Sequence, residues 1–270
     1  MKLILLYYLL FFQLILFGQQ LTLISWNIRD FGKSKDSLEM VTIAKTIRDA
    51  DIIAIQEVVA KDPGGAQAVA RLADQLNRLG TKWDYRISDP TNSPSPYRSE
   101  RYAYLWKPSK VILIGRPQLD KELATVCDRE PFIGRFRDLK TKKEFILVNF
   151  HSRRYNEHPE DEVVTFQYYK DRFEIPVVIA GDFNLDDKHP VFSPMYEQGY
   201  QASIKNQATT IKSKCDHGYY LNHAIDNIFI PGDYKILEGR VIDFIKDCSN
   251  LDAALMISDH VPVSVRIGIY

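Results

Sequence analysis

Short apolar runs alternate with segments of helical spacing in the first part of the chain. The run from Leu21 is apolar and β-branched, which predicts a buried strand. Asp36 and Glu39 then form the pattern of a capping box, and the apolar residues that follow have the spacing of a helix from about residue 37 to residue 49. A second apolar run, DIIAIQEV, precedes a second amphipathic segment that stops at Gly80. The chain therefore opens as strand, helix, strand, helix.

From residue 83 onward, apolar runs follow one another with turns between them. The predicted strands cover 83–88, 101–107, 110–115, 131–138 and 144–152, a helix covers 160–173, and further strands cover 176–182, 224–230, 240–245 and 261–269. This mixed order predicts an α/β fold whose sheets have parallel and antiparallel neighbours and whose helices cover the outer faces. The Pro-rich and Ser-rich stretch 88–100 predicts a functional loop within one domain that spans 21–270.

The first eighteen residues follow the pattern of a secretory signal peptide. An apolar run from Leu3 to Phe17 follows Lys2, and Gly18 supplies a small residue for cleavage near Gly18–Gln20. The run falls short of the roughly 20 apolar residues that span a bilayer. No cysteine near Gly18 can accept a lipid. We therefore expect residues 1–18 to be removed on export, no stable membrane anchor, and a secreted or periplasmic location.

Composition narrows the classes of partner. The chain has 270 residues, 45% of them hydrophobic, which is enough to bury a substantial core. Its 35 basic and 35 acidic residues cancel, which argues against nucleic-acid binding through bulk positive charge. The three cysteines allow at most one intramolecular disulfide, and their spacing matches no zinc motif. If any two of them pair, we expect Cys215 and Cys248, which leaves Cys127 over; the cysteine count leaves the pairing open.

Polar groups gather where apolar strands stop, with the segment ISDH entering the last strand from its other side. The residues at these positions are Asn27, Glu57, His151, Asp182, Asn184, Asp226, Asp259 and His260. Such groups cost desolvation free energy unless they satisfy one another or a ligand. If the strand ends meet at one edge of the sheets, the carboxylates and amides suit Mg²⁺, Mn²⁺ or Ca²⁺ better than Zn²⁺. Two histidines beside carboxylates can act as acid and base. Together these groups indicate a metal-assisted phosphoester hydrolase.

The fragments SWN, QE, GDFN and SDH, in this order across Leu21 to Tyr270, resemble the endonuclease/exonuclease/phosphatase superfamily. SERY around Glu100, DREP around Arg129 and WNIRDFG near the start resemble its secreted deoxyribonuclease I branch. The resemblance implies a four-layer sandwich of two mixed β-sheets packed face to face with helices outside. It also implies an exported, Mg²⁺-dependent endonuclease that hydrolyses DNA with little sequence specificity. Mn²⁺ is a second candidate ion.

The resemblance further implies a role for each site residue. Glu100 would partner His151 and Asp226 would partner His260, one imidazole activating water and the other protonating the 3′ oxygen, in an order that stays open. Glu57 would hold the metal, and Asn27, Asp182, Asn184 and Asp259 would position the metal, the phosphate or the water. Arg129, with Asn27 and Asn184, would contact a phosphate of DNA. The histidines outside these motifs are His158, His189, His217 and His223, which we expect to be solvated or structural.

Some positions depart from that branch. Val59 and Ala60 replace an expected basic residue after QEV, and the loop before SERY carries three prolines. The paired-cysteine loop expected before Arg129 is missing, which leaves a structural Ca²⁺ site open. Two alternatives remain: a secreted phosphodiesterase of this fold acting on lipid headgroups or small phosphoesters, and a non-catalytic binding module. We expect a monomer whose partner is DNA.

Overall fold

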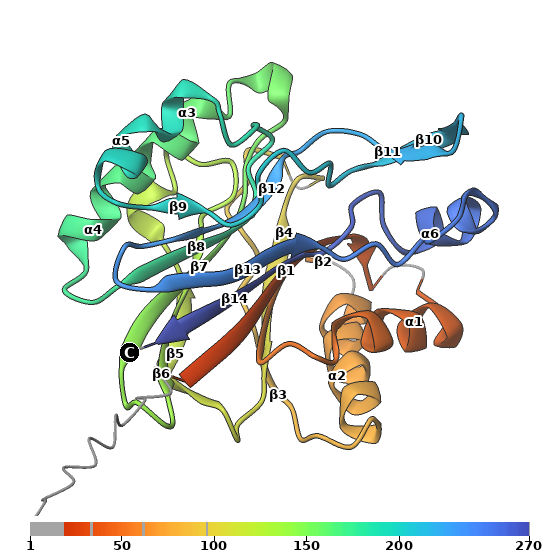
Figure 1. Cartoon of the computed structure of the whole chain (residues 1–270), viewed down its shortest axis with the longest axis horizontal. Helices are drawn as coiled ribbons and strands as arrows, with labels where there is room; N and C mark the ends of the chain where they lie inside the picture. The colour runs from red at the N-terminus through yellow and green to blue at the C-terminus, as the bar shows by residue number, and fades with distance from the viewer. Residues whose placement is uncertain (1–18, 33–34, 61–62, 96, 270) are drawn as a thin grey trace, which may run out of the picture.

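Two six-stranded mixed sheets pack face to face in the computed structural model, which describes residues 19–32, 35–60, 63–95 and 97–269 (Figure 1). The first sheet has the order β13 (Lys235–Val241), β14 (Val263–Ile269), β1 (Gln19–Phe31), β2 (Ile52–Val59), β4 (Glu100–Trp106) and β3 (Asp84–Ile87). The second has the order β5 (Val111–Leu119), β6 (Phe132–Asp138), β7 (Glu144–His151), β8 (Val177–Asp182), β12 (Asp226–Ile230) and β9 (Gln201–Ala202). Each sheet contains one parallel pair, β1 with β2 and β7 with β8.

Helices cover the outer faces of both sheets. The helices α1 (Ser37–Ile47) and α2 (Pro63–Arg78) pack on the first sheet, and α1 begins with the predicted capping box of Asp36 and Glu39. The second sheet is covered by α3 (Glu160–Val163), α4 (Tyr169–Arg172) and α5 (Ser193–Glu197), with the 3₁₀ turns η3 (Val164–Tyr168) and η4 (Pro190–Phe192) between them. Further 3₁₀ turns lie at η1 (Lys121–Leu123), η2 (Tyr155–Glu157) and η5 (Cys248–Asn250), and α6 (Leu251–Ile257) precedes the last strand.

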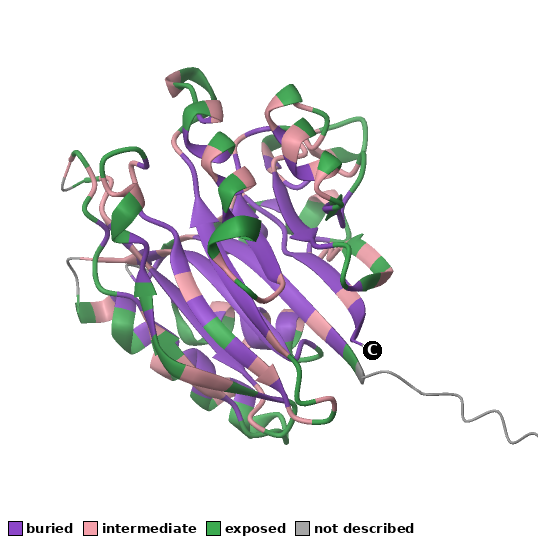
Figure 2. Cartoon of the chain, turned by 90° about the vertical axis from the view of Figure 1, so that its left-hand side faces the viewer, coloured by how far each residue is buried: buried purple, intermediate pink, exposed green. Residues whose placement is uncertain are grey.

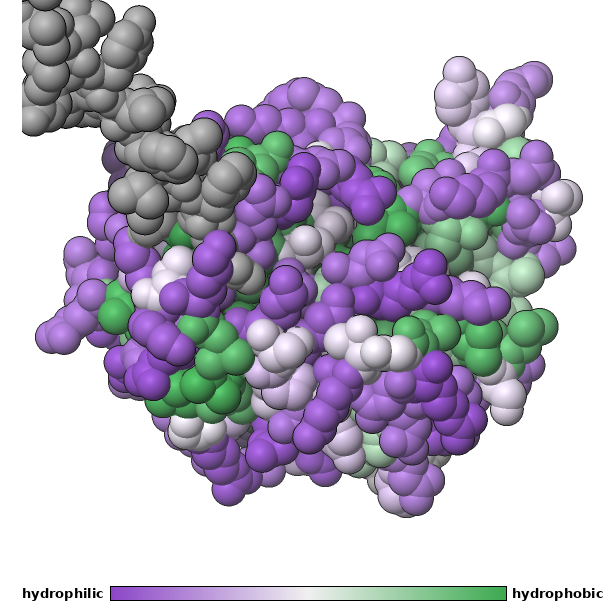
Figure 3. All heavy atoms as spheres, turned by 60° about the horizontal axis from the view of Figure 1, so that its bottom comes forward, coloured by the Kyte–Doolittle hydropathy of each residue, from purple (hydrophilic) through white to green (hydrophobic). Residues whose placement is uncertain are grey.

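The apolar core lies in three layers that follow from this arrangement. Residues such as Leu23, Tyr104 and Phe136 fill the space between the two sheets. Separate clusters lie between each sheet and its helices, so the central strands are buried on both faces, whereas edge strands such as β13 are partly exposed (Figure 2). The face in Figure 3 is mostly hydrophilic, with apolar residues in separate groups. The predicted four-layer α/β sandwich is therefore confirmed.

Two of the predicted elements are wrong in detail. The helix expected over 160–173 is divided into α3, η3 and α4, because the hydroxyl of Thr165 donates to the carbonyl of Glu162 within a β-branched run. The strand expected over 240–245 ends at Val241, since its neighbour β14 is preceded by Pro262, which has no N–H to extend the ladder.

Two features of the C-terminal third, a two-stranded hairpin and α6, were also missed from the sequence. The hairpin of β10 (Ile211–Asp216) and β11 (Tyr219–Leu221) stands apart from both sheets, and α6 packs against it. The disulfide between Cys215 and Cys248 joins the hairpin to η5, which agrees with the limit of one intramolecular disulfide and with the expected pair, and Cys127 is a buried free thiol.

The predicted signal peptide, residues 1–18, lies outside the described residues. Within the part of the chain that the structure describes, no helix is long and apolar enough to cross a membrane.

Candidate active site

Three of the predicted site residues lie in one row at the ends of neighbouring strands of the second sheet. His151 is the last residue of β7, and Asp182, the last of β8, is its register partner. Asp226, the first residue of β12, is the register partner of Asp182 on the other side. Because β7 and β8 are parallel and β12 runs the other way, these two strand ends and one strand start meet at the same edge. The sequence placed these residues at strand boundaries; the sheet order makes them neighbours.

His151 is held by a buried carboxylate from the first sheet. Its Nδ1 lies 3.1 and 3.0 Å from the two carboxylate oxygens of Glu100, and both side chains are buried. Arg129 pairs with the same carboxylate through Nε at 3.0 Å and donates to the carbonyl of Ser152 at 2.9 Å. Burial raises the pKa of the Glu100 carboxyl, but the His151 and Arg129 charges outweigh it and lower this pKa. Glu100 is therefore held as a carboxylate beside the imidazole.

His260 forms the second carboxylate–imidazole pair. Its Nδ1 lies 2.8 Å from Oδ2 of Asp226. Burial lowers the pKa of the His260 imidazole, but the charges of Asp226 and Asp182 outweigh it and raise the pKa to about 10. The backbone is fixed as well, because the indole of Trp26 donates to the His260 carbonyl at 2.9 Å and the His260 N–H donates to Oγ of Ser258 at 3.0 Å. The Asp226–His260 pair is thus a buried hydrogen-bonded unit.

Asp182 lies between the two imidazoles. Its Oδ2 is 3.6 Å from Nε2 of His151 and 3.6 Å from Nε2 of His260. The side-chain amide of Asn27 donates to the same oxygen at 3.2 Å, and the N–H of Asn184 donates to Oδ1 at 3.0 Å. Both sheets therefore contribute to one small polar centre.

The donor set at this centre fits a hard cation. Ligand atoms of Asp182, Asp226 and His260 lie within 4.8 Å of one another. Burial raises the pKa of the Asp226 carboxyl, the His260 imidazolium opposes it, and the negative charge of Asp182 raises it further. Oδ1 of Asn27 is buried and has no hydrogen-bond partner. Two adjacent buried carboxylates and an unsatisfied amide oxygen are the groups that a divalent cation would relieve.

Glu57 stands at the rim of this centre. Asn27 Nδ2 donates to its Oε1 at 3.1 Å, and the N–H of Asp30 donates to its Oε2 at 3.2 Å. Its backbone has φ of 61°, a left-handed conformation that costs free energy for a residue with a Cβ. The N–H of Glu57 donates to Glu100 at 3.3 Å, which joins this rim to the His151 pair.

The remaining predicted residues lie around the same centre. Asn184 has a left-handed φ of 51° after β8 and is half-buried. Asp259 is half-buried, and its negative charge contributes to raising the pKa of its neighbour His260. Arg129 is nearly buried and its guanidinium is already engaged with Glu100 and Ser152.

The histidines outside the motifs have other contacts. His158 pairs with Glu160 on the surface, and His217 lies near Asp216 at the hairpin turn. Nδ1 of His189 accepts from the N–H of Val191, and Nε2 of His223 contacts the side chain of Asn222.

Sequence reasoning missed the buried polar residues that position the site. Gln56 donates to Oδ1 of Asn149 at 2.6 Å and so links β2 to β7 beneath the site. Oγ1 of Thr209 accepts from the N–H of Asp226 at 3.1 Å. The hydroxyl of Ser258 donates to the carbonyl of Asn27 at 2.6 Å, which ties β1 to the segment that carries His260. Gln56 and Ser258 belong to the QE and SDH fragments, but the supporting role of all three residues is apparent only from their complete burial and their hydrogen bonds.

Comparison with known proteins gives a consistent family. The Endonuclease/Exonuclease/phosphatase family model matches residues 24–260. Deoxyribonuclease-1 from Bos taurus is 30% identical over 272 residues, which cover 93% of this chain and 93% of that protein. A deoxyribonuclease from Thioalkalivibrio sp. is 27% identical over 266 residues, which cover 91% of this chain and 70% of that protein.

Solved structures share the fold at low sequence identity. An endonuclease/exonuclease/phosphatase family protein from Bacteroides thetaiotaomicron superposes with a TM-score of 0.68 at 16% identity, covering 94% of this chain and 99% of that chain. A mannosyl-6-phosphatase from the same organism superposes with a TM-score of 0.64 at 17% identity, covering 92% of this chain and 99% of that chain. Because the matching family model covers residues 24–260, which include every residue of the polar centre, the chain belongs to the endonuclease/exonuclease/phosphatase family.

Proposed function

We propose that the protein is an exported, divalent-metal-dependent endonuclease that hydrolyses DNA phosphodiester bonds with little sequence specificity. One observation carries the chemistry: two imidazoles, each bound through Nδ1 to its own buried carboxylate, present Nε2 atoms 3.6 Å from the same oxygen of Asp182. A phosphate at this centre would lie between two groups that can transfer protons.

The two histidine pairs divide the proton transfers. With Nδ1 bound to Glu100 or Asp226, each imidazole has its second nitrogen directed to the centre. One Nε2 accepts a proton from the attacking water, and the other donates a proton to the leaving 3′ oxygen. The carboxylates stabilise the imidazolium form of each ring and keep its orientation.

We assign Asp182, Asn27 and Glu57 as the residues that hold the cation, which we infer to be Mg²⁺ or Mn²⁺. Binding through His260 and Asp226 instead would remove that histidine from proton transfer, since its Nδ1 is already occupied by Asp226. When bound, such an ion neutralises phosphate charge and favours ionisation of water. Asn184 and Asp259 lie beside the same centre and are assigned to position the phosphate or the water.

Arg129 serves the site through Glu100 in this proposal. Its Nε pairs with the carboxylate that orients His151, so the guanidinium fixes that pair and adds positive charge next to the phosphate. The sequence resemblance implied a phosphate contact for Arg129, and in this proposal Arg129 also orients His151 through Glu100.

The substrate assignment rests on the deoxyribonucleases among the relatives. A nuclease that recognises the phosphate backbone and groove shape needs no sequence code. The balanced charge of the chain then predicts modest affinity that salt readily weakens. We further propose that residues 1–18 direct export to a secreted or periplasmic location, and that residues 21–270 act as one monomeric catalytic domain.

The decisive experiment is nicking of supercoiled plasmid by the mature protein with Mg²⁺, with and without chelator. His151→Ala should reduce the rate by about 100-fold or more, because it removes a proton-transfer group. His158→Asn is the matched control: this histidine is exposed, and Asn tolerates its left-handed φ of 60°.

Sphingomyelin, a small phosphodiester and RNA are assayed in parallel. Release of phosphocholine without plasmid nicking would replace DNA by a lipid headgroup as the substrate. Inactivity on every substrate, with Mg²⁺ present and the fold intact, would favour a non-catalytic binding module.

A further inference from the structure

The β10–β11 hairpin leaves the body of the protein directly beside the candidate active site. At its base, the N–H of Ile211 donates to the carbonyl of Asp259 at 2.7 Å, and Thr210 pairs with His260 in an isolated β-bridge. The preceding residue, Thr209, accepts from the N–H of Asp226. The hairpin therefore begins on the wall that carries the His260–Asp226 pair, and Figure 1 shows it extending outward beside α6.

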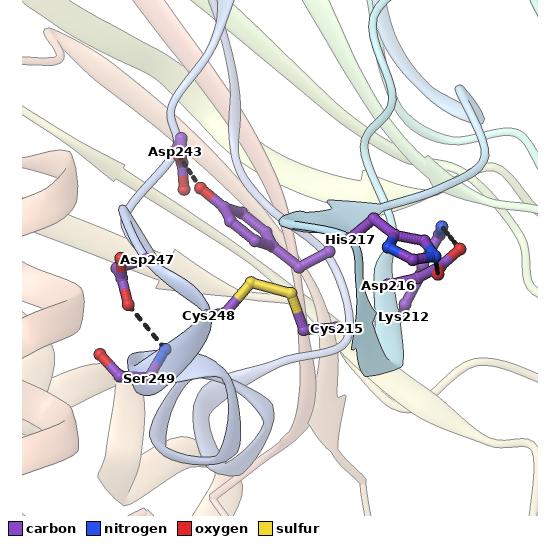
Figure 4. The surroundings of a disulfide bond; sticks show 9 residues. Lys212, Cys215, Asp216, His217, Asp243, Asp247, Cys248 and Ser249 are labelled. Carbon is purple, nitrogen blue, oxygen red and sulfur yellow. Dashed lines mark hydrogen bonds and ion pairs between the residues drawn. A yellow bond between two sulfur atoms is a disulfide. The ribbon is translucent and has the colours of Figure 1, made fainter.

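One face of the hairpin is fixed to the body. Ile211 packs with Ile245 and Leu251, and Cys215 and Leu221 lie against the same cluster. The disulfide from Cys215 to Cys248 and a 2.6 Å hydrogen bond from the Tyr220 hydroxyl to Asp243 add two further attachments (Figure 4). A two-stranded hairpin by itself is marginally stable in water, so these attachments are what hold it in one position.

The exposed side chains of the hairpin include basic and aromatic groups. Figure 4 shows Lys212 and His217 on the side away from the disulfide. Lys214 is exposed, and Tyr219 is 72% exposed. Lys212 pairs with Asp216 at 3.8 Å, an exposed ion pair of little strength that a phosphate can replace.

The segment 205–223, which contains the hairpin, is more basic than the chain as a whole. Residues 205–223 contain three lysines and one aspartate, whereas the whole chain has no formal net charge. Lysines together with an exposed aromatic ring on one surface are typical of nucleic-acid-binding sites. Ile211, Cys215, Tyr220 and Leu221 pack against the body, so Tyr219 is the one largely exposed apolar side chain among the described residues of the hairpin.

We propose that Lys212, Lys214 and Tyr219 bind the DNA backbone at a distance from the scissile phosphate. The proposal rests on the proposed nuclease function and extends its contact surface. A strand rises about 3.3 Å per residue, so Lys212 and Lys214 lie about 3 and 10 Å along the strand from Ile211, and the hairpin turn lies about 17 Å from it. At 3.4 Å per base pair, this distance corresponds to about five base pairs of duplex.

The disulfide has a defined part in this surface. Because the hairpin is attached at Cys215, close to its turn, its lysines are held near the path of the substrate before binding. Ordering a mobile segment costs free energy on binding, and a covalent attachment removes part of that cost.

The test is the salt dependence of plasmid nicking by Lys212→Ala/Lys214→Ala. The matched control is Lys143→Ala/Lys235→Ala, which removes the same charge at exposed positions near the strand ends remote from His151 and His260. Each phosphate contact contributes about 0.9 to the slope of log affinity against log salt, so the hairpin variant should lower the slope for kcat/KM by about 1.8. The gap between the wild-type protein and this variant should then narrow about tenfold between 50 and 200 mM salt.

Hydrolysis of bis(p-nitrophenyl) phosphate is measured on the same proteins, since this small diester cannot reach the hairpin. The expected result is a lower ratio of plasmid to small-diester efficiency for the hairpin variant alone. Equal salt slopes for the hairpin and control variants would overturn the proposal while leaving the nuclease function in place. A wild-type protein that hydrolyses the small diester and cuts no DNA would instead overturn the proposed function, and the hairpin proposal with it.

Discussion

Asp182 and Asp226 are register partners on the antiparallel strands β8 and β12, which places two buried carboxylates side by side at the end of one sheet. In an apolar core such a pair would be unfavourable, because like charges at this separation repel in a low dielectric. A divalent cation bound between the two carboxylates would relieve this repulsion. The first prediction tests for such an ion.

Asp182→Asn should abolish stabilisation of the fold by Mg²⁺. At a Mg²⁺ concentration 100 times its Kd, binding should stabilise the wild-type protein by about 2.7 kcal/mol. Removing the charge that both imidazoles and Asn27 contact should eliminate most of this gain. Thermal unfolding with and without Mg²⁺ measures it, and Asp186→Asn, at an exposed aspartate after the same strand, should retain the wild-type shift. An Asp182→Asn protein that Mg²⁺ still stabilises would place the cation elsewhere.

Gln56→Ala should destabilise the fold by about 2–4 kcal/mol. The substitution leaves a cavity between the sheets and removes the donor to Asn149 Oδ1, which is completely buried. Urea unfolding gives the free energy of unfolding. Gln118→Ala, at an exposed glutamine, should change it by less than about 0.5 kcal/mol. Equal effects of the two substitutions would argue against a cross-sheet role for Gln56.

Gly181→Ala should prevent normal pairing of β7 with β8. Gly181 has φ of 155°, and a Cβ there would overlap the carbonyl oxygen of Phe150 on the neighbouring strand. Because the backbone itself must move, we expect little soluble protein. At Gly80, where φ is also positive but a Cβ meets nothing within 4 Å, alanine should cost only about 1–2 kcal/mol. Soluble yield and the unfolding midpoint distinguish the two cases, and normal stability of Gly181→Ala would contradict the close approach.

Cys215→Ser/Cys248→Ser should lower the free energy of unfolding by about 3–4 kcal/mol. The disulfide closes a loop with a sequence separation of 33 residues, and the chain-entropy relation gives this magnitude. For a protein of this size, the unfolding midpoint should fall by about 10 °C. Cys127→Ser is the control for thiol chemistry, although its buried position adds a packing cost of its own. A midpoint within 2–3 °C of the wild-type value would show that the hairpin is held without the disulfide.

The Tyr220–Asp243 hydrogen bond should stabilise the protein only above acidic pH. Burial raises the pKa of the Asp243 carboxyl, but the Tyr220 hydroxyl and the N–H groups of Lys246 and Ile245 outweigh it and lower this pKa. A group whose pKa is lower in the folded state contributes stability above its unfolded pKa and loses it as pH falls through the folded pKa.

Tyr220→Phe should therefore cost about 1 kcal/mol near neutral pH, with the difference shrinking below about pH 4. Urea midpoints of the two proteins between pH 2 and pH 7 measure the difference. A difference that stays constant to the lowest pH would remove Asp243 as the acceptor.

The sequence by itself determined the order of most strands and helices and the candidate site residues at their ends. Apolar periodicity identified the strands that carry Asn27, His151 and Asp182, and the capping box of Asp36 and Glu39 identified the start of α1. These signals are local, because strand alternation and helix capping depend on neighbours in the chain. The motif fragments added the pairing of Glu100 with His151 and of Asp226 with His260, which the structure shows as hydrogen bonds.

Only the tertiary structure decided which residues support those groups and where the β10–β11 hairpin lies relative to them. The supporting roles of Gln56, Thr209 and Ser258 have no local signature, even though Gln56 and Ser258 belong to the QE and SDH fragments, because their hydrogen-bond partners lie 93, 17 and 231 positions away in the chain. The hairpin was missed because β10 and β11 are short and polar on one face, and their inner face is defined by packing against α6. Pairing across such distances depends on sheet order and burial, which become defined when the two sheets close on each other.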